Sequence, residues 1–235
     1  MEKSRATRAV LLIPGLLPLL AAGASGTSQG GPDICGLGQM QAPINITTTV
    51  KEKLPAIEFN YRPAVLKVLN SGRTVQVNFD AGSQITIGAE TYTLLQFHTH
   101  TPSAERVQGK SYDMAAHLVH KSEAGQLAVV VVVYKQGKEL AALQPLWKNM
   151  PTRAAPERTM EGIKINAADL LPANKGYYTF EGPPPTSPPS QAVRWLVLKE
   201  PVEMSKGQVL RLQAIFGKKA RPVQPLHGRV VKESL

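Results

Sequence analysis

Four of the five histidines in this chain of 235 residues lie within one stretch of 23 residues: His98, His100, His117 and His120. His98 and His100 are two residues apart, so on a β-strand their side chains project from the same face, with the Cα atoms about 6–7 Å apart. Two imidazoles at this spacing can bind one metal ion, and a histidine on a neighbouring strand would complete a three-ligand set. His117 and His120 would face opposite sides of a strand, so only one of them can join, and the spacing does not choose between them.

Three nitrogen ligands with a fourth position left for water are typical of a catalytic zinc site. Gln96 lies two residues before His98 and shares its face, so its amide is placed to hydrogen-bond a ligating imidazole. Paired histidines also occur as ordinary polar residues on a half-exposed strand. The third histidine and the glutamine together favour metal binding.

The elements that must position these residues are predominantly β-strands. Segments of alternating or continuous apolar character, separated by turn residues, predict strands. They cover residues 64–69, 74–79, 84–87, 92–100, 114–120, 127–134, 177–180 and 192–198. Helical patterning is limited to 205–216, which begins with Ser205 as an N-cap, and more weakly to 140–149. The sequence thus predicts a large sheet with a few surface helices.

The composition limits the class of protein. The chain carries 27 Lys+Arg against 17 Asp+Glu, a formal net charge of +10, but the basic residues are scattered and are not interleaved with aromatic residues. A nucleic-acid-binding surface is therefore not indicated. The single cysteine excludes a disulfide-stapled mini-protein and a zinc-finger array. The length fits one domain.

The first 24 residues have the pattern of a secretory signal peptide. Three basic residues precede an apolar run over 9–24, which ends in Ala-Gly-Ala, the small residues of a cleavage site. The run is short for a transmembrane helix and contains two prolines. We expect 1–24 to be removed, 25–33 to form a flexible leader and 34–235 to form the domain. No membrane span would remain after cleavage, and the protein would be periplasmic or secreted.

At these and other positions the sequence resembles an α-class carbonic anhydrase of the secreted bacterial type. The matching segments follow the family's order along nearly all of the chain after residue 34. They are 41–46 (Gln-Ala-Pro-Ile-Asn-Ile), 70–77 (Asn-Ser-Gly-Arg-Thr-Val-Gln-Val), 96–103 (Gln-Phe-His-Thr-His-Thr-Pro-Ser), 117–121 (His-Leu-Val-His-Lys), 177–180 (Tyr-Tyr-Thr-Phe), 195–201 (Trp-Leu-Val-Leu-Lys-Glu-Pro) and 221–226 (Arg-Pro-Val-Gln-Pro-Leu). The resemblance implies a mainly β, single-domain fold with a few short surface helices. Its large, mostly antiparallel twisted sheet would have about ten strands.

The resemblance also implies a metal site and a reaction. One zinc ion per chain would be bound by His98, His100 and His117. His120 would point away, and Gln96 would orient His98. The implied reaction is the reversible hydration of carbon dioxide to bicarbonate and a proton, because three neutral imidazoles leave zinc the positive charge that activates water near neutral pH.

Two further sets of residues follow from the resemblance. An apolar wall that suits uncharged carbon dioxide as the small-molecule substrate is implied for Val119, Val129 and Trp195. The family's gatekeeper threonine falls on Pro185 in an alignment without gaps, and on Thr186 with one residue inserted and one deleted. The second alignment keeps the family's Thr-Thr-Pro-Pro pattern as Thr-Ser-Pro-Pro, so Thr186 is the predicted catalytic residue.

Several positions depart from the family pattern. Arg73 stands where the family has its proton-shuttle histidine, and an arginine stays protonated and cannot relay a proton. The glutamate that acts through the gatekeeper threonine falls on Ala104, and Glu105 could replace it only if the chain shifted by one residue. The carboxylate two residues before the third ligand is Ala115. His117 is therefore expected to lose its usual partner, and zinc to bind about 10–100-fold more weakly.

These departures spare the ligands and fall on the residues that support them. We therefore predict an active but slowed carbonic anhydrase. The alternative is a zinc-binding, nearly inactive relative that acts as a binding module. Secreted members often pair a cysteine at the place of Cys35 with a second one, but Ser190 stands near the second place. Cys35 is thus predicted to be a free thiol or the link in a dimer.

Overall fold

The structure, a computed structural model, describes residues 43–181 and 193–235 apart from positions 219, 221 and 227. The predicted signal peptide and leader, Cys35 and Thr186 lie outside the described residues. Nothing in the described residues supports a dimer through Cys35, which itself lies outside them.

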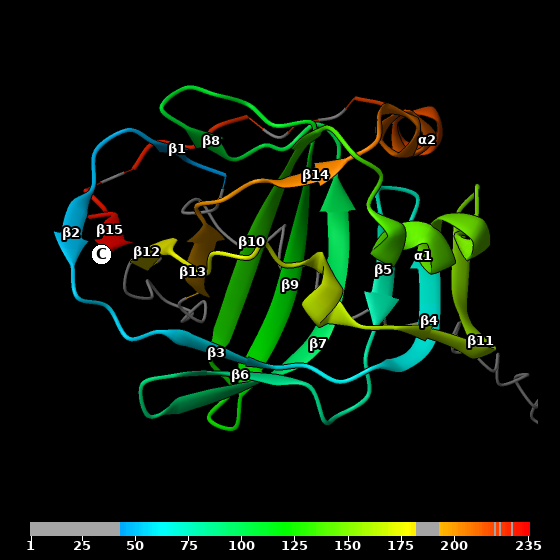
Figure 1. Ribbon diagram of the computed structural model, residues 1–235, viewed down its shortest axis with the longest axis horizontal. Helices are drawn as coiled ribbons and strands as arrows, with labels where there is room; N and C mark the ends of the chain where they lie inside the picture. Colours follow the sequence, from blue (N-terminus) through cyan, green and yellow to red (C-terminus); the bar gives the residue numbers. More distant parts are fainter. Residues whose placement is uncertain (1–42, 182–192, 219, 221, 227) are drawn as a thin grey trace, which may run out of the picture.

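Strands dominate the described residues, and most of them join one sheet (Figure 1). The strands are β1 (Asn45–Ile46), β2 (Val50–Glu52), β3 (Ile57–Asn60), β4 (Ala64–Asn70), β5 (Val75–Asn78), β6 (Gln84–Ile87), β7 (Glu90–His100), β8 (Arg106–Val107), β9 (Met114–Ser122), β10 (Leu127–Gln136), β11 (Ala155–Ile165), β12 (Tyr177–Glu181), β13 (Val193–Leu198), β14 (Val202–Met204) and β15 (Lys232–Ser234). The helices are the 3₁₀ segments η1 (Ala141–Leu143) and η2 (Ala167–Leu170), and α1 (Gln144–Asn149) and α2 (Lys206–Phe216).

The large sheet contains thirteen of the strands found in the described part of the chain. Its continuous path runs β11-β4-β5-β7-β9-β10-β13-β12-β15-β2, with β3, β6 and β14 attached beside it. Most neighbours are antiparallel, whereas β13 and β14 run parallel to β10, and β2 runs parallel to β15. The predicted mainly β fold, built on a large and mostly antiparallel sheet with a few short helices, is confirmed.

Two apolar layers cover the central strands β7, β9 and β10, which run side by side in Figure 1. Alternate residues point into a large core on one face, which we call the core face and which includes Phe97, Leu118 and Val130. The residues between them point to the opposite face, called here the site face, which includes Val119 and Val129. The continuous apolar run of β10 is explained by this double burial, because a strand covered on both faces has no polar side.

A β-bulge in β7 decides which side chains reach each face. Leu94 pairs with His120, but the next pair is Gln96 with Val119, so β7 holds one extra residue at Leu95. The bulge puts Leu94 on the core face and Gln96 on the site face, although they are two positions apart and would share a face in a regular strand. The two-residue alternation from Gln96 onward then fixes the direction of the following side chains.

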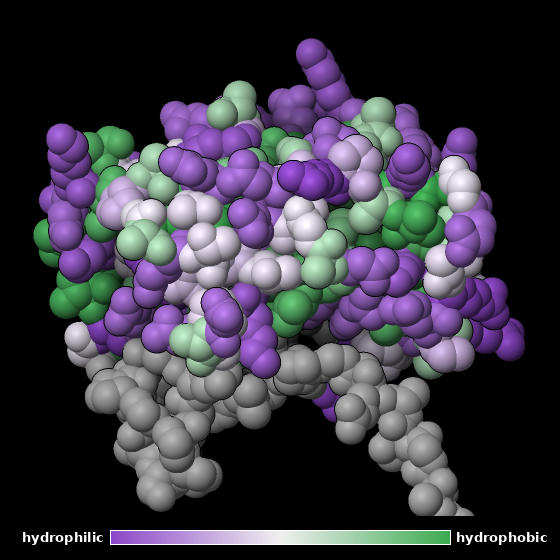
Figure 2. Space-filling view, turned by 90° about the horizontal axis from the view of Figure 1, so that it is seen from below, coloured by the Kyte–Doolittle hydropathy of each residue, from purple (hydrophilic) through white to green (hydrophobic). Residues whose placement is uncertain are grey.

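Helices play a minor part. The Ser205 side chain accepts a hydrogen bond from the backbone of Gln208, whose own side chain bonds back to Ser205 in a capping box, so α2 begins as predicted. The weaker prediction over 140–149 corresponds to η1 followed by α1. None of the helices among the described residues is long and apolar enough to cross a membrane. In the view of Figure 2, hydrophilic residues are spread over the surface between small apolar patches.

Candidate metal centre

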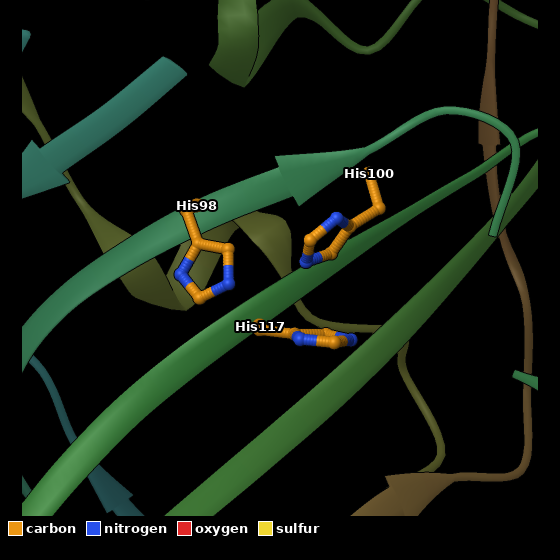
Figure 3. A group of neighbouring side chains, drawn as sticks. All are labelled: His98, His100 and His117. Atoms are coloured by element: carbon orange, nitrogen blue, oxygen red, sulfur yellow. The ribbon is translucent and has the colours of Figure 1, made fainter. Parts of the chain in front are cut away.

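Three histidines from two neighbouring strands converge on the site face (Figure 3). His98 and His100 come from β7, and His117 lies directly opposite His98 in the antiparallel register of β9. Their ligand nitrogens all lie within 4.8 Å of one another, and their ring centroids are 4.6 to 5.3 Å apart. His98 and His117 are buried, and His100 is half-buried. Alternation along β7 and register with β9 thus bring these side chains together.

Hydrogen bonds to neighbouring side chains orient two of the rings. Gln96 Oε1 accepts a hydrogen bond from Nδ1 of His98 at 3.0 Å, which leaves Nε2 of that ring for a metal. Glu105 Oε1 accepts from Nε2 of His117 at 2.7 Å, so Nδ1 is the nitrogen of His117 that can coordinate. Ligand imidazoles in metalloproteins commonly donate their second N–H to such partners, which fixes tautomer and ring orientation.

Glu105 is buried, with 2% of its surface exposed. Burial alone would raise the pKa of its carboxyl, but the His117 imidazole beside it, together with the nearby His100, lowers that pKa to about 2. The carboxylate is therefore ionised at neutral pH. Its second oxygen accepts a hydrogen bond from Ser103 Oγ at 3.1 Å.

The expectation that His117 lacks a carboxylate partner is wrong. Ala115 offers none, but the side chain of Glu105 reaches His117 from the loop that follows β7. The family pattern places the carboxylate on β9, two residues before His117, whereas here it comes from the loop after His100, which turns Glu105 inward. The predicted weakening of zinc binding through position 115 loses its basis.

His120 takes a different place from the three. It lies on the core face, where Tyr61 Oη donates to its Nε2 at 2.8 Å and its Nδ1 donates to the carbonyl oxygen of Ala128 at 3.3 Å. The Tyr61 ring also stacks on it, with centroids 5.9 Å apart. Burial lowers the pKa of His120 to about 3, so it stays neutral. Spacing alone left the third ligand open, and the geometry brings His117, not His120, to the other two.

The predicted apolar wall lies beside this cluster. Val119 pairs with Val129 across β9 and β10, and Val129 pairs with Trp195 across β10 and β13. All three are buried. The Trp195 ring lies 5.7 Å from the His117 ring and stacks on Phe180 with centroids 6.1 Å apart. The register therefore forms an apolar row that adjoins the histidines.

The remaining predicted residues divide into two groups. Thr186 and the alternative Pro185 lie outside the described residues, so their roles stay predictions. Arg73 is exposed in the turn between β4 and β5. Ala104 is buried and has no polar side-chain atom.

Zinc fits this donor set. Three imidazole nitrogens from a rigid pair of strands are the ligands that catalytic zinc sites use, with Zn–N distances of about 2.0–2.1 Å. The hydrogen bonds that Gln96 and Glu105 accept leave one nitrogen each of His98 and His117 for a metal, and both of these side chains are buried. Among the histidine, cysteine, aspartate and glutamate side chains of the described residues, these three histidines form the group whose ligand atoms lie close enough together to share a metal ion.

A large, mostly antiparallel sheet thus carries three histidines on two of its central strands. The chain belongs to the α-type carbonic anhydrases: the sequence pattern of the family described as eukaryotic-type carbonic anhydrase matches residues 28–235. It is thus an enzyme of the carbonic anhydrase family.

Individual relatives agree with this assignment. A carbonic anhydrase of Neisseria gonorrhoeae is 41% identical over 202 residues, which cover 85% of this chain and 79% of that protein. The structure of the Photobacterium profundum α-carbonic anhydrase matches with a TM-score of 0.76 at 38% identity, over 85% of this chain and 92% of that one. The Thermovibrio ammonificans α-carbonic anhydrase in complex with the inhibitor sulfanilamide matches with a TM-score of 0.77 at 37% identity, over 85% and 89%.

Proposed function

We propose that this protein catalyses the reversible hydration of carbon dioxide to bicarbonate and a proton, with one zinc ion held by His98, His100 and His117. The observation that carries the proposal is the convergence of these three imidazoles beside an apolar row. Metal ligands and an apolar surface together suit a reaction between activated water and an uncharged substrate.

The residues of the chain have separate tasks in this proposal. When bound, zinc supplies the Lewis acidity that makes water nucleophilic near neutral pH. Gln96 holds His98 in the tautomer that presents Nε2. Val119, Val129 and Trp195 offer carbon dioxide an apolar surface without hydrogen-bonding demands, so substrate binding is weak and product bicarbonate, which is charged, is not retained there.

Proton release is the step that we propose to be slow. Arg73 occupies the place of the family's shuttle histidine, and an arginine side chain, unlike histidine, does not relay protons. Protons would leave through water or buffer, and a proton acceptor added to the solution would raise the turnover number.

Stopped-flow hydration of carbon dioxide tests both parts. Protein with one zinc per chain should raise the rate above that of buffer, and metal-free protein should not. Imidazole should raise the turnover number, and Arg73→His should raise it in dilute buffer without added imidazole. Zinc-loaded protein with no rate above buffer would support the alternative, a nearly inactive binding module. An unchanged rate in imidazole would contradict the missing shuttle.

We also propose that the protein is exported and that residues 1–24 are removed on the way. The basic start, the apolar run and the small residues at its end support this proposal. N-terminal sequencing of the protein from the periplasmic fraction and the medium should find a start at Ser25. Intact protein confined to the cytoplasmic fraction would contradict it.

A further inference from the structure

The loop between β7 and β8 carries a carboxylate that points into the metal centre. Glu105 is 2% exposed, and its two oxygens contact different partners, Nε2 of His117 at 2.7 Å and Oγ of Ser103 at 3.1 Å. A buried carboxylate is costly unless it is hydrogen-bonded and faces positive charge. The hydrogen bonds to His117 and Ser103 meet the first condition. A metal ion bound at Nδ1 of His117 would meet the second.

We propose that Glu105 is the positioning residue of the third ligand, and that it gives His117 the carboxylate support that position 115 does not supply. This inference rests on the proposed zinc site. By accepting the Nε2 proton of His117, Glu105 holds the ring in the tautomer whose Nδ1 faces the other two histidines. Its negative charge also makes the imidazole a stronger donor toward a cation.

The neighbouring strand leaves this task to the loop. Ala115 faces His100 in the register of β9 and is fully buried, so the strand itself brings no acceptor to the site. Glu105 instead approaches from outside the sheet. Support for the ligand therefore depends on where the loop is held.

Backbone contacts hold the loop on both sides of Glu105. Ser103 N donates to the carbonyl oxygen of Tyr112 at 3.0 Å, and Arg106 N donates to that of Ile44 at 3.1 Å. The second contact belongs to the two-stranded pairing of β1 with β8. Glu105 lies two residues after the first contact and one residue before the second. Its carboxylate therefore has little freedom to leave His117, which is what a positioning residue requires.

Two substitutions and one matched control test the proposal by zinc affinity, measured by competition with a chromophoric chelator. Glu105→Ala removes both the charge and the acceptor, and zinc should bind about 10–100-fold more weakly. Glu105→Gln keeps the shape, an acceptor oxygen and the contact with Ser103, so it should fold and lose affinity by a smaller factor, at least threefold. If Glu105→Ala does not fold, the zinc affinity of Glu105→Gln tests the proposal.

The control is Glu233→Gln. Glu233 is also a hydrogen-bonded, ion-paired carboxylate, with Lys199 Nζ at 2.9 Å and Thr49 Oγ1 at 2.6 Å. It lies on β15, four strands from β9 in the sheet order, which is about 19 Å at the usual strand spacing. The Glu233→Gln variant should bind zinc with the same affinity as the unmodified protein.

The visible spectrum of bound cobalt(II) gives a second readout, since it follows ligand geometry. The proposal expects a changed spectrum in the Glu105 variants and an unchanged one in Glu233→Gln. Zinc affinities of the Glu105 variants within a factor of two of the unmodified protein would overturn it, even if that protein hydrates carbon dioxide. Weakened zinc binding in the variants of a protein without hydration activity would uphold it and refute the proposed function instead.

Discussion

His117 and His120 lie three residues apart on the same strand, yet the structure gives them opposite surroundings. His117 is on the site face, where an ionised carboxylate contacts one ring nitrogen and two further imidazoles lie within metal-sharing distance. His120 is on the core face, where a neutral phenol and a backbone carbonyl take both nitrogens. Both side chains are buried, so burial does not separate them.

The difference lies in the electrostatic setting that each face provides. The carboxylate of Glu105 stabilises positive charge on the His117 ring or on a metal ion bound to it, which suits a metal ligand. His120 has only neutral partners in its hydrogen bonds, the Tyr61 phenol and the Ala128 carbonyl, and burial lowers its pKa to about 3. The partner of the second ring nitrogen thus differs between the two faces, an ionised carboxylate for His117 and a neutral phenol for His120.

The largest expected effect is the difference in zinc content between variants of His117 and of His120. His117→Gln should abolish stoichiometric zinc binding, with a loss greater than the roughly 10–100-fold caused by removing a supporting hydrogen bond. His120→Gln should still bind one zinc per chain, although its fold is less stable. Metal analysis after dialysis measures both. Equal zinc content in the two variants would contradict the assignment of ligands by face.

The pH dependence of stability tests the core face. An imidazole in the unfolded chain titrates near pH 6.5, whereas that of His120 titrates at about 3 in the fold. The unfolded chain binds more protons in this window, so stability falls as the pH falls, by about 1.4 kcal/mol per pH unit from this residue. Urea unfolding between about pH 6.5 and 4.5 should show a shallower dependence for His120→Gln. If the free energy of unfolding depends on pH equally in His120→Gln and in the unmodified protein, His120 is not the neutral, buried group described.

Removing the phenol of Tyr61 should have a smaller effect, confined to stability. Tyr61→Phe leaves Nε2 of His120 buried without its donor, at a cost of about 1–3 kcal/mol. Zinc affinity should not change, because the phenol lies on the face away from the metal centre. Chemical denaturation and chelator competition on the same protein check the two statements, and a weakened zinc affinity would link the faces that we describe as separate.

The smallest expected effect compares neighbouring valines of β10. Val129 is on the site face and Val130 on the core face, and both are buried. Val129→Ala removes two methyl groups; the loss of contact with carbon dioxide worth about one buried methylene, about 0.8 kcal/mol, should lower kcat/KM about fourfold. Val130→Ala should reduce stability and leave kcat/KM unchanged. If both variants have the same kcat/KM, Val129 does not form part of the substrate wall.

Local pattern was sufficient to predict the central strands and the histidine cluster. The apolar runs of β7, β9 and β10 are unambiguous, and the spacing of His98 and His100 fixes a shared face once the strand is known. The edge strand β11 was missed because most of its residues are exposed and it contains Pro156 and Gly162, which argue against a strand when pattern alone is considered.

Two features of the site depended on contacts that the sequence does not encode locally. The choice between His117 and His120 follows from the register of β9 against β7. After the bulge at Leu95, His117 pairs with His98 on the site face, whereas His120 pairs with Leu94 on the core face. The role of Glu105 follows from a loop conformation, since two-residue alternation does not extend past the end of a strand. Long-range contacts decide both, which is why the supporting residues were harder to predict than the ligands.

The rate of carbon dioxide hydration per bound zinc tests the central claim most directly. Stopped-flow measurements on the unmodified protein, His117→Gln and His120→Gln, in the same buffer and at known zinc content, would separate metal chemistry from general effects on the fold. We predict catalysis by the unmodified protein and by His120→Gln, and none by His117→Gln. Catalysis that survives in His117→Gln, or its absence from the zinc-loaded unmodified protein, would contradict the account.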